Sequence, residues 1–217
     1  MFSQEQLKSM LSLQDSMNKK INPNWLAAGY AYLRAATHEL IEMQEHIGWK
    51  WWKMQAKDLP QAQMELVDVW HFALSDILIY FNGDVDCASL AIRQELTSNR
   101  DIVTFDGHDY SFKEQGLLDN IELLAGLCTA KRFDVPLFVF ISSQVEMSSC
   151  DLYQQYIGKN VLNFFRQDNG YKDGSYIKHW DGKEDNEHLV IILNSLDVNS
   201  DGYSDKIYEE LKKVYPK

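Results

Sequence analysis

The chain has 217 residues, a formal net charge of −11, 45% hydrophobic residues and 24% charged residues. This hydrophobic fraction is ordinary for a globular protein and argues against general disorder. The 32 acidic residues outnumber the 21 basic ones, which excludes a non-specific binder of duplex DNA, because such proteins need a basic surface. With only four prolines and eleven glycines, the sequence favours long helices over a many-stranded sandwich.

The cysteines and the N-terminus indicate a cellular compartment. Three cysteines, an odd number, form no CxxC pair, so neither a zinc ribbon nor a disulfide framework is supported and a reducing cytosol is expected. The N-terminus MFSQEQLKSM lacks the apolar core of a secretory signal, and no run of 18 apolar residues could form a membrane span. We expect a cytoplasmic protein, from a bacterium or a bacteriophage-infected cell.

Apolar residues recur at helical spacing along most of the chain. This spacing predicts helices over residues 4–19, 25–46, 60–81, 115–131, 134–166 and 187–215. Residues 84–115 are mixed and polar, with a turn signal at Asp106-Gly107-His108-Asp109, and are interpreted as a helix followed by a variable connection. No repeat or linker is apparent, so the prediction is one all-α domain over residues 1–217, a multi-helix bundle with antiparallel core helices.

A long polar loop is predicted over residues 167–186, QDNGYKDGSYIKHWDGKEDN. Its glycines lie at 170, 174 and 182, and it contains almost no aliphatic residues. Loops of this length in compact domains are usually functional or disordered, and the aromatic residues Tyr171, Tyr176 and Trp180 argue against disorder. The hypothesis is an active-site loop that is mobile without ligand and closes over it.

Two pairs of acidic residues carry the first chemical signal. Glu39 and Glu42 are spaced i,i+3 in one predicted helix, and Glu65 and Asp68 have the same spacing in the next, so each pair shares a helix face. Both pairs lie among apolar neighbours, and four carboxylates on adjacent helices suit a hard cation such as Mg²⁺. The alternative is a set of exposed acids on amphipathic helices. A di-iron centre is weaker, because it needs Glu-x-x-His motifs.

A basic, aromatic and amide-rich segment follows at residues 156–180, with a local charge of +2. Lys159, Asn163 and Arg166 recur at helical spacing, and Lys172 and Lys178 lie in the loop beyond them. Arg, Lys and amide groups together suit phosphate recognition, while a solvated basic face is the simpler interpretation. Near the N-terminus, the i,i+4 amides Gln14 and Asn18 could bind a pyrimidine edge, although an exposed amide pair is more common.

Five separated motifs resemble one known family. They are LQDSMN at 13–18, ExxE at 39–42, WKWWK at 49–53, ELVDVWHF at 65–72 and YIGKNVLNFFRQDNGYKDGSYIKHWDGKEDN at 156–186. In this order they resemble the dimeric, all-α dUTPases, which belong with the MazG-like proteins and the phage dCTPase-dUTPases to the all-α nucleoside triphosphate pyrophosphohydrolases. The resemblance covers most of the chain except 84–115 and the C-terminal helix.

The resemblance implies a role for each motif. Glu39, Glu42, Glu65 and Asp68 become ligands of two or more Mg²⁺ ions and the catalytic carboxylates. The residues expected to contact the phosphates and the sugar are Lys159, Asn163, Arg166, Lys172 and Lys178. Tyr171 would pack on the deoxyribose or base. The uracil pocket is formed by Gln14, Asn18, His71, Phe72 and one tryptophan, for which Trp51 is a marginal choice over Trp52. The family is a tight homodimer, so the partner subunit is expected to add phosphate contacts.

The expected reaction is hydrolysis of dUTP to dUMP and pyrophosphate, with dUDP as a second substrate suggested by the family. Such an enzyme keeps uracil out of DNA and supplies dUMP for dTMP synthesis. Mg²⁺ would reverse the local negative charge and activate a water, and Glu39 is the candidate base. Two alternatives remain: a related pyrophosphohydrolase acting on dCTP or another dNTP, and a non-enzymatic acidic protein that binds a regulatory protein partner. Neither membrane association nor stable nucleic-acid binding is expected.

Overall fold

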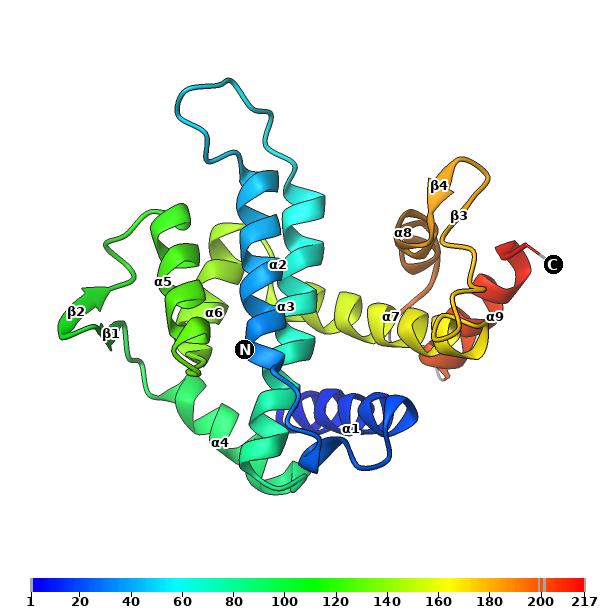
Figure 1. The fold of residues 1–217 in the computed structure, drawn as a ribbon, viewed down its shortest axis with the longest axis horizontal. Coiled ribbons are helices and arrows are strands. Elements are labelled where there is room, and N and C mark those ends of the chain that lie inside the picture. Colours follow the sequence, from blue (N-terminus) through cyan, green and yellow to red (C-terminus); the bar gives the residue numbers. More distant parts are fainter. Residues whose placement is uncertain (1, 199, 201, 217) are drawn as a thin grey trace.

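The computed structural model describes residues 2–198, 200 and 202–216. In these residues nine α-helices and a short 3₁₀ helix form nearly all of the regular structure, with two small two-stranded sheets (Figure 1). The prediction of an all-α fold is therefore confirmed. None of the helices in the described ranges is both long and apolar enough to cross a membrane.

The centre of the fold is an antiparallel pair of helices, α2 (Tyr32–Ile47) and α3 (Leu59–Tyr80), which pack along most of their length. Their facing sides bury apolar residues such as Leu40, Met43 and Leu66. Helix α1 (Gln4–Ile21) starts at a capping box formed by Ser3 and Gln6 and crosses the lower end of this pair in Figure 1. The antiparallel core helices of the prediction are thus present.

One side of the central pair is covered by α5 (Leu117–Thr129) and α6 (Val135–Gln144). Between them and α3, the chain forms α4 (Val85–Thr97) and the hairpin of β1 (Ile102–Phe105) and β2 (His108–Ser111). Asp106 and Gly107 both have positive φ, 49° and 77°, which is the geometry of a tight hairpin turn. The turn signal in this segment is confirmed.

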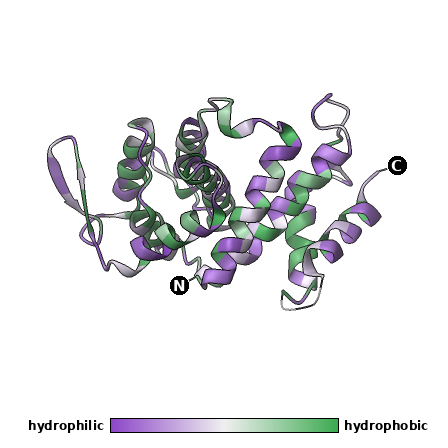
Figure 2. Ribbon diagram, turned by 90° about the horizontal axis from the view of Figure 1, so that it is seen from below, coloured by the Kyte–Doolittle hydropathy of each residue, from purple (hydrophilic) through white to green (hydrophobic). Residues whose placement is uncertain are grey.

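The other side is built on α7 (Ser149–Asp168), which extends away from α3 in Figure 1. The sheet of β3 (His179–Trp180) and β4 (Lys183–Glu184), with α8 (Asp185–Ser195) and α9 (Tyr203–Val214), packs around it. Figure 2 shows hydrophobic residues gathered where helices meet and hydrophilic residues on their outer sides. The fold therefore brings α1, α3 and α7 together at one point, beside the acidic faces of α2 and α3.

Three predicted helices differ from the structure. The second starts at Tyr32 rather than residue 25, because Trp25 is buried in a separate 3₁₀ turn (Trp25–Ala27) and Gly29 has a φ of 68°. The helix expected over 134–166 is two helices, since Glu146 is left-handed at φ 59° and Ser148 caps a new start. The C-terminal pattern is likewise divided into α8 and α9 by a break after Ser195.

Candidate active site

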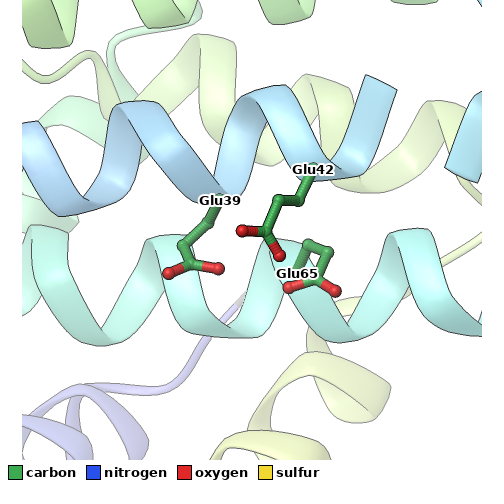
Figure 3. A group of neighbouring side chains, drawn as sticks. All are labelled: Glu39, Glu42 and Glu65. Carbon is green, nitrogen blue, oxygen red and sulfur yellow. The ribbon is translucent and has the colours of Figure 1, made fainter. Parts of the chain in front are cut away.

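Three of the four carboxylates of the two i,i+3 pairs converge between α2 and α3. Glu39 and Glu42 point from α2 toward Glu65 on α3 (Figure 3), and one oxygen from each of the three lies within 4.8 Å of the others. Asp68 is one turn beyond Glu65 on the same face of α3, and its charge acts on both Glu39 and Glu65. These four residues are called the acidic cluster below.

Burial and the close approach of the carboxylates raise pKa values in the acidic cluster. Burial, followed by the charges of Asp68, Glu65 and Glu42, raises the pKa of Glu39 to about 8. Burial and the charge of Asp68 also raise the pKa of Glu65. Buried carboxylates that repel one another are unfavourable when ionised. All ligand atoms here are carboxylate oxygens, so the cluster fits a hard divalent cation, which would relieve this repulsion.

Lys159 connects the acidic cluster to α7. Its side chain is buried, its Nζ lies 2.8 Å from a carboxylate oxygen of Asp68, and it also donates to Oδ1 of Asn186 at 3.2 Å. His46 is the other basic side chain at the cluster, with Nε2 3.4 Å from Glu65. A buried lysine beside a metal-binding carboxylate can neutralise charge on either the protein or a bound phosphate.

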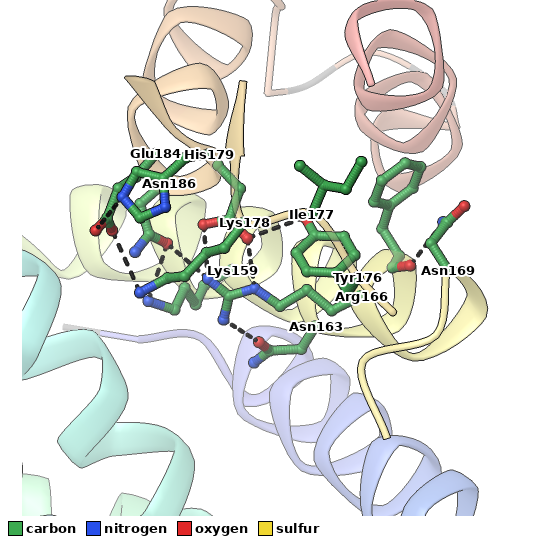
Figure 4. Close-up of polar contacts among 12 residues, drawn as sticks. Lys159, Asn163, Arg166, Asn169, Tyr176, Ile177, Lys178, His179, Glu184 and Asn186 are labelled. Carbon is green, nitrogen blue, oxygen red and sulfur yellow. Dashed lines mark hydrogen bonds and ion pairs between the residues drawn. The ribbon is translucent and has the colours of Figure 1, made fainter. Parts of the chain in front are cut away.

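Arg166 is held in place by a bidentate ion pair. Its Nε and Nη2 lie 2.7 and 2.8 Å from the two carboxylate oxygens of Asp185, whose side chain is fully buried. Its Nη1 donates to Asn163, and the Tyr176 hydroxyl donates to Asp185 (Figure 4). Burial opposes ionisation of Asp185, but the hydrogen bonds and charge of Arg166 lower its pKa below the usual value.

A cleft of about 490 Å³ opens where α1, α3 and α7 meet. Eight of the residues predicted to contact the nucleotide or metal line it, from three separate motifs. Its lining is formed by Gln14, Met17, Asn18, Ile21, Tyr30, Tyr32, Asp68, His71, Phe72, Asn163, Arg166, Gln167 and Tyr171. Because Asp68 also belongs to the acidic cluster, the cleft is continuous with it.

The amides expected in the uracil pocket are not an exposed pair. Gln14 and Asn18 are both buried, and Nε2 of Gln14 donates to Oδ1 of Asn18 at 3.1 Å. Nδ1 of His71 lies 2.8 Å from Oε1 of Gln14, and burial lowers the pKa of His71 to about 4. The histidine is thus a neutral partner for the amides rather than a cation for the phosphates.

The ring systems near the amides come from α2 and α3. Phe72 faces Tyr32, with ring centroids 6.5 Å apart, and burial raises the pKa of Tyr32 to about 12. The expectation that Trp51 lines this pocket is not met within one chain, because Trp51 is 90% exposed in the loop between α2 and α3. Figure 1 shows this loop at the opposite end of the pair from α1.

The two loop lysines are less directly placed than Lys159. Nζ of Lys172 is 3.5 Å from the carbonyl oxygen of Ile21, at the edge of the cleft. Lys178 faces Glu184 at 3.4 Å and is about half exposed. Both side chains are exposed, and the structure does not bring them into the cleft.

The loop 167–186 has two parts of different character. From Tyr176 onward it is anchored: the Tyr176 ring stacks on Tyr215, Trp180 stacks on His188, and β3 pairs with β4. Residues 171–175 are exposed turns, with the Tyr171 ring 5.8 Å from the Arg166 guanidinium. The exposed part of the loop is therefore shorter than the segment predicted from the sequence.

Sequence reasoning missed several residues that shape the site. Asp185 and Tyr176 hold Arg166, and Tyr32 supplies the ring opposite Phe72. Asp185 follows a capping motif at the start of α8 and resembles an ordinary first-turn acid. Its burial depends on α7 and α8 lying side by side, for which the sequence has no local signal.

Comparison with known proteins decides the family. A family model described as dUTPase matches residues 6–171, more than half of the chain. The chain belongs to the dUTPase family. A search of curated proteins finds no significant match.

Membership assigns the activity. The protein is a dUTP diphosphatase that hydrolyses dUTP, and enzymes of this family use a divalent metal. The matched residues contain the acidic cluster, the buried amides and the whole of α7. Tyr176 and Asp185 lie beyond the match, so the anchoring of Arg166 is built from a part of this dUTPase that the family model does not cover.

Proposed function

We propose that this dUTPase hydrolyses dUTP to dUMP and pyrophosphate in an Mg²⁺-dependent reaction, and that it also cleaves dUDP. The observation that carries the proposal is the continuity of the site. Asp68 belongs both to the acidic cluster and to the lining of the cleft, and the cleft holds the buried amides Gln14 and Asn18. A nucleotide with its phosphates at the cluster and its base at the amides spans this arrangement.

The binding roles follow from the side chains that line the cleft. Gln14, Asn18 and His71 bind the uracil edge, and Phe72 packs on the ring. Arg166, oriented by Asp185, and Asn163 contact phosphate or sugar, while Tyr171 covers the deoxyribose. Lys159, already 2.8 Å from Asp68, stabilises charge that develops on the phosphates. Lys172 reaches the phosphates when the exposed turns at 171–175 close, and Lys178 through a rotation of its half-exposed side chain.

The acidic cluster would hold the metal. Glu39, Glu42, Glu65 and Asp68 offer eight carboxylate oxygens, which is compatible with two or more Mg²⁺ ions shared with substrate phosphates. Mg²⁺ held there would supply positive charge for the phosphates and would lower the pKa of a water. Without the cation, the cluster would repel a substrate that is close to a tetra-anion.

Glu39 is the proposed general base. Its carboxylate lies beside those of Glu42 and Glu65, where a water held by the bound metal would be within its reach. In this role Glu39 orients the attacking water and takes its proton during in-line attack. No covalent intermediate is needed, and we assign no nucleophilic Ser or Cys.

The assembly belongs to the proposal as well. We infer a homodimer of single-domain subunits over residues 1–217, in which some phosphate contacts come from the partner subunit. Trp51 could contact uracil only across such an interface, because in its own chain it lies at the far end of α2 and α3. The biological role would be to keep uracil out of DNA and to supply dUMP for dTMP synthesis.

The test is a pyrophosphate-release assay with each dNTP, and a phosphate-release assay with dUDP, with and without Mg²⁺. We expect turnover of dUTP that requires Mg²⁺, and its loss in Glu65→Gln with the helical circular dichroism unchanged. Glu122→Gln, at an exposed acid of α5, is the matched control and should retain wild-type turnover. Near-normal kcat for Glu65→Gln at saturating Mg²⁺ would disprove the metal assignment, and faster turnover of dCTP than dUTP would identify the related pyrophosphohydrolase instead.

A further inference from the structure

A chain of buried hydrogen bonds continues behind the amides of the cleft. Nδ2 of Asn18 donates to Oγ of Ser75 at 2.9 Å, and Oγ of Ser75 donates to the carbonyl oxygen of His71 at 3.0 Å. At the other end, the Tyr156 hydroxyl lies 2.9 Å from both Oε1 of Gln14 and the carbonyl oxygen of Met10. Ser75 and Tyr156 are fully buried and are absent from the lining of the cleft as described.

Ser75 fixes which way the Asn18 amide points. A serine hydroxyl has one proton, and here that proton is donated to a backbone carbonyl, which can only accept. The Ser75 oxygen must therefore accept from Asn18, so the NH₂ group of Asn18 is directed toward α3. A reversed Asn18 amide would place its oxygen against the Ser75 oxygen and would require the serine proton to leave the His71 carbonyl.

The Asn18 orientation in turn fixes the Gln14 amide. Oδ1 of Asn18 can only accept, so Gln14 donates to it through its NH₂ group. Oε1 of Gln14 then faces Nδ1 of His71 at 2.8 Å and the Tyr156 hydroxyl at 2.9 Å, whose single proton is shared between this oxygen and the Met10 carbonyl. The two amides therefore have a single common orientation, which is set by groups at both ends of the chain of hydrogen bonds.

The groups left free match one pyrimidine. Gln14 retains one N–H, Asn18 retains one N–H, and Oδ1 of Asn18 retains a lone pair. This gives two donors and one acceptor, whereas uracil presents O2 and O4 as acceptors and N3–H as a donor. Cytosine has an acceptor at N3 and a donor at position 4. Reversing both amides would replace donors by acceptors and would favour cytosine at those two positions.

We propose that Ser75 and Tyr156 are positioning residues that set the preference for dUTP over dCTP by holding Asn18 and Gln14 in the uracil-reading orientation. Neither residue touches the nucleotide. The inference rests on the proposed uracil pocket, because it concerns the orientation of the same two amides. It adds two specificity-determining residues that sequence reasoning did not single out.

The experiment compares kcat/KM for dUTP and dCTP in the full-length protein and in Ser75→Ala and Tyr156→Phe. We expect each variant to lower the ratio of the two values about tenfold, which corresponds to about 1.4 kcal/mol. The matched control is Ser89→Ala: Ser89 is also fully buried, accepts from Nε2 of Gln4 at 2.7 Å and donates to a helix carbonyl at 2.9 Å, but lies on α4. It should leave the ratio unchanged.

Two results would overturn the inference: a wild-type ratio in both variants, or an equal fall of kcat/KM for both nucleotides, which indicates a structural role only. A wild-type ratio in one variant would remove that residue from the proposal. If the unmodified protein does not prefer dUTP over dCTP, the proposed base recognition itself fails. A preference that persists in both variants refutes the positioning role alone, so the two failures are distinguishable.

Discussion

Mg²⁺ binding to the acidic cluster should release nearly one proton per chain at pH 7. In the metal-free protein Glu39 has a pKa of about 8, because it is buried beside Asp68, Glu65 and Glu42. A carboxyl group binds a cation in its ionised form, so the proton must leave when the metal binds. Since the carboxylates interact strongly, this proton belongs to the cluster as a unit.

The size of the effect follows from the titration. With a pKa of about 8, one pH unit below that value leaves about nine-tenths of the sites protonated, so about 0.9 proton is released per chain. Below pH 8 the Mg²⁺ affinity should rise about tenfold for each pH unit, because ever fewer protons compete with the metal. Above pH 8 the affinity should become independent of pH.

Isothermal titration calorimetry measures this directly. Mg²⁺ is titrated at pH 7 into protein in two buffers with different ionisation enthalpies, and the difference in observed heat gives the number of protons released. Glu39→Gln should release clearly fewer protons than the wild type, since the amide does not titrate and removes one of the repelling charges. Glu122→Gln should behave as the wild type.

Two outcomes would refute the reasoning. Mg²⁺ binding without proton release in the wild type would show that all four carboxylates of the cluster are already ionised at pH 7. Unchanged proton release in Glu39→Gln would show that a group other than Glu39 holds the proton at pH 7.

Three further predictions concern selectivity, motion and stability. Asn18→Ala should reduce the preference for dUTP over dCTP by roughly 10- to 100-fold. The preference for dUTP over dTTP should remain nearly intact, because thymine has the same hydrogen-bonding edge as uracil. An equal loss of both preferences in steady-state assays would show that Asn18 does not recognise the base edge. Hydrogen exchange over residues 171–175 should slow when a non-hydrolysable dUTP analogue and Mg²⁺ are added, whereas unchanged exchange would refute closure. Asp185→Asn should lower the free energy of unfolding, measured by denaturant unfolding, by about 3 kcal/mol, because it leaves Arg166 buried without its anion. The control is Glu210→Gln, which breaks an exposed ion pair and should cost less than about 1 kcal/mol. An equally small loss for Asp185→Asn would show that the Arg166–Asp185 ion pair contributes little to stability. Because the folded pKa of Asp185 is lowered, its contribution is present above the unfolded pKa and is lost as the pH falls through the folded value.

Much of the site could be predicted from local sequence. The spacing of Glu39 with Glu42 and of Glu65 with Asp68 fixes each pair on one face of a helix, and two helices joined by a short loop must lie antiparallel and adjacent. Periodicity therefore accounts for the two acidic pairs, whereas the meeting of Glu39 and Glu42 with Glu65 is a contact between helices that the structure shows. The same holds for the i,i+4 amides Gln14 and Asn18, whose family motif then supplied their role.

Other features depended on contacts between distant segments. Trp51 and Phe72 were both expected in the uracil pocket, yet one is exposed in the loop between α2 and α3 and the other lines the cleft. Asp185 becomes the partner of Arg166 only because α8 packs on α7. Neither feature has a signal within a few residues.

The sequence by itself determined the helical fold class, the acidic pairs and the family, because helix periodicity and motif order are local properties of the chain. Only the tertiary structure decided how the polar groups are oriented. The direction of the Asn18 amide depends on Ser75, 57 residues away, and that of Gln14 on Tyr156, 142 residues away. Hydrogen-bond direction is a property of neighbours in space, which for these amides are remote in sequence.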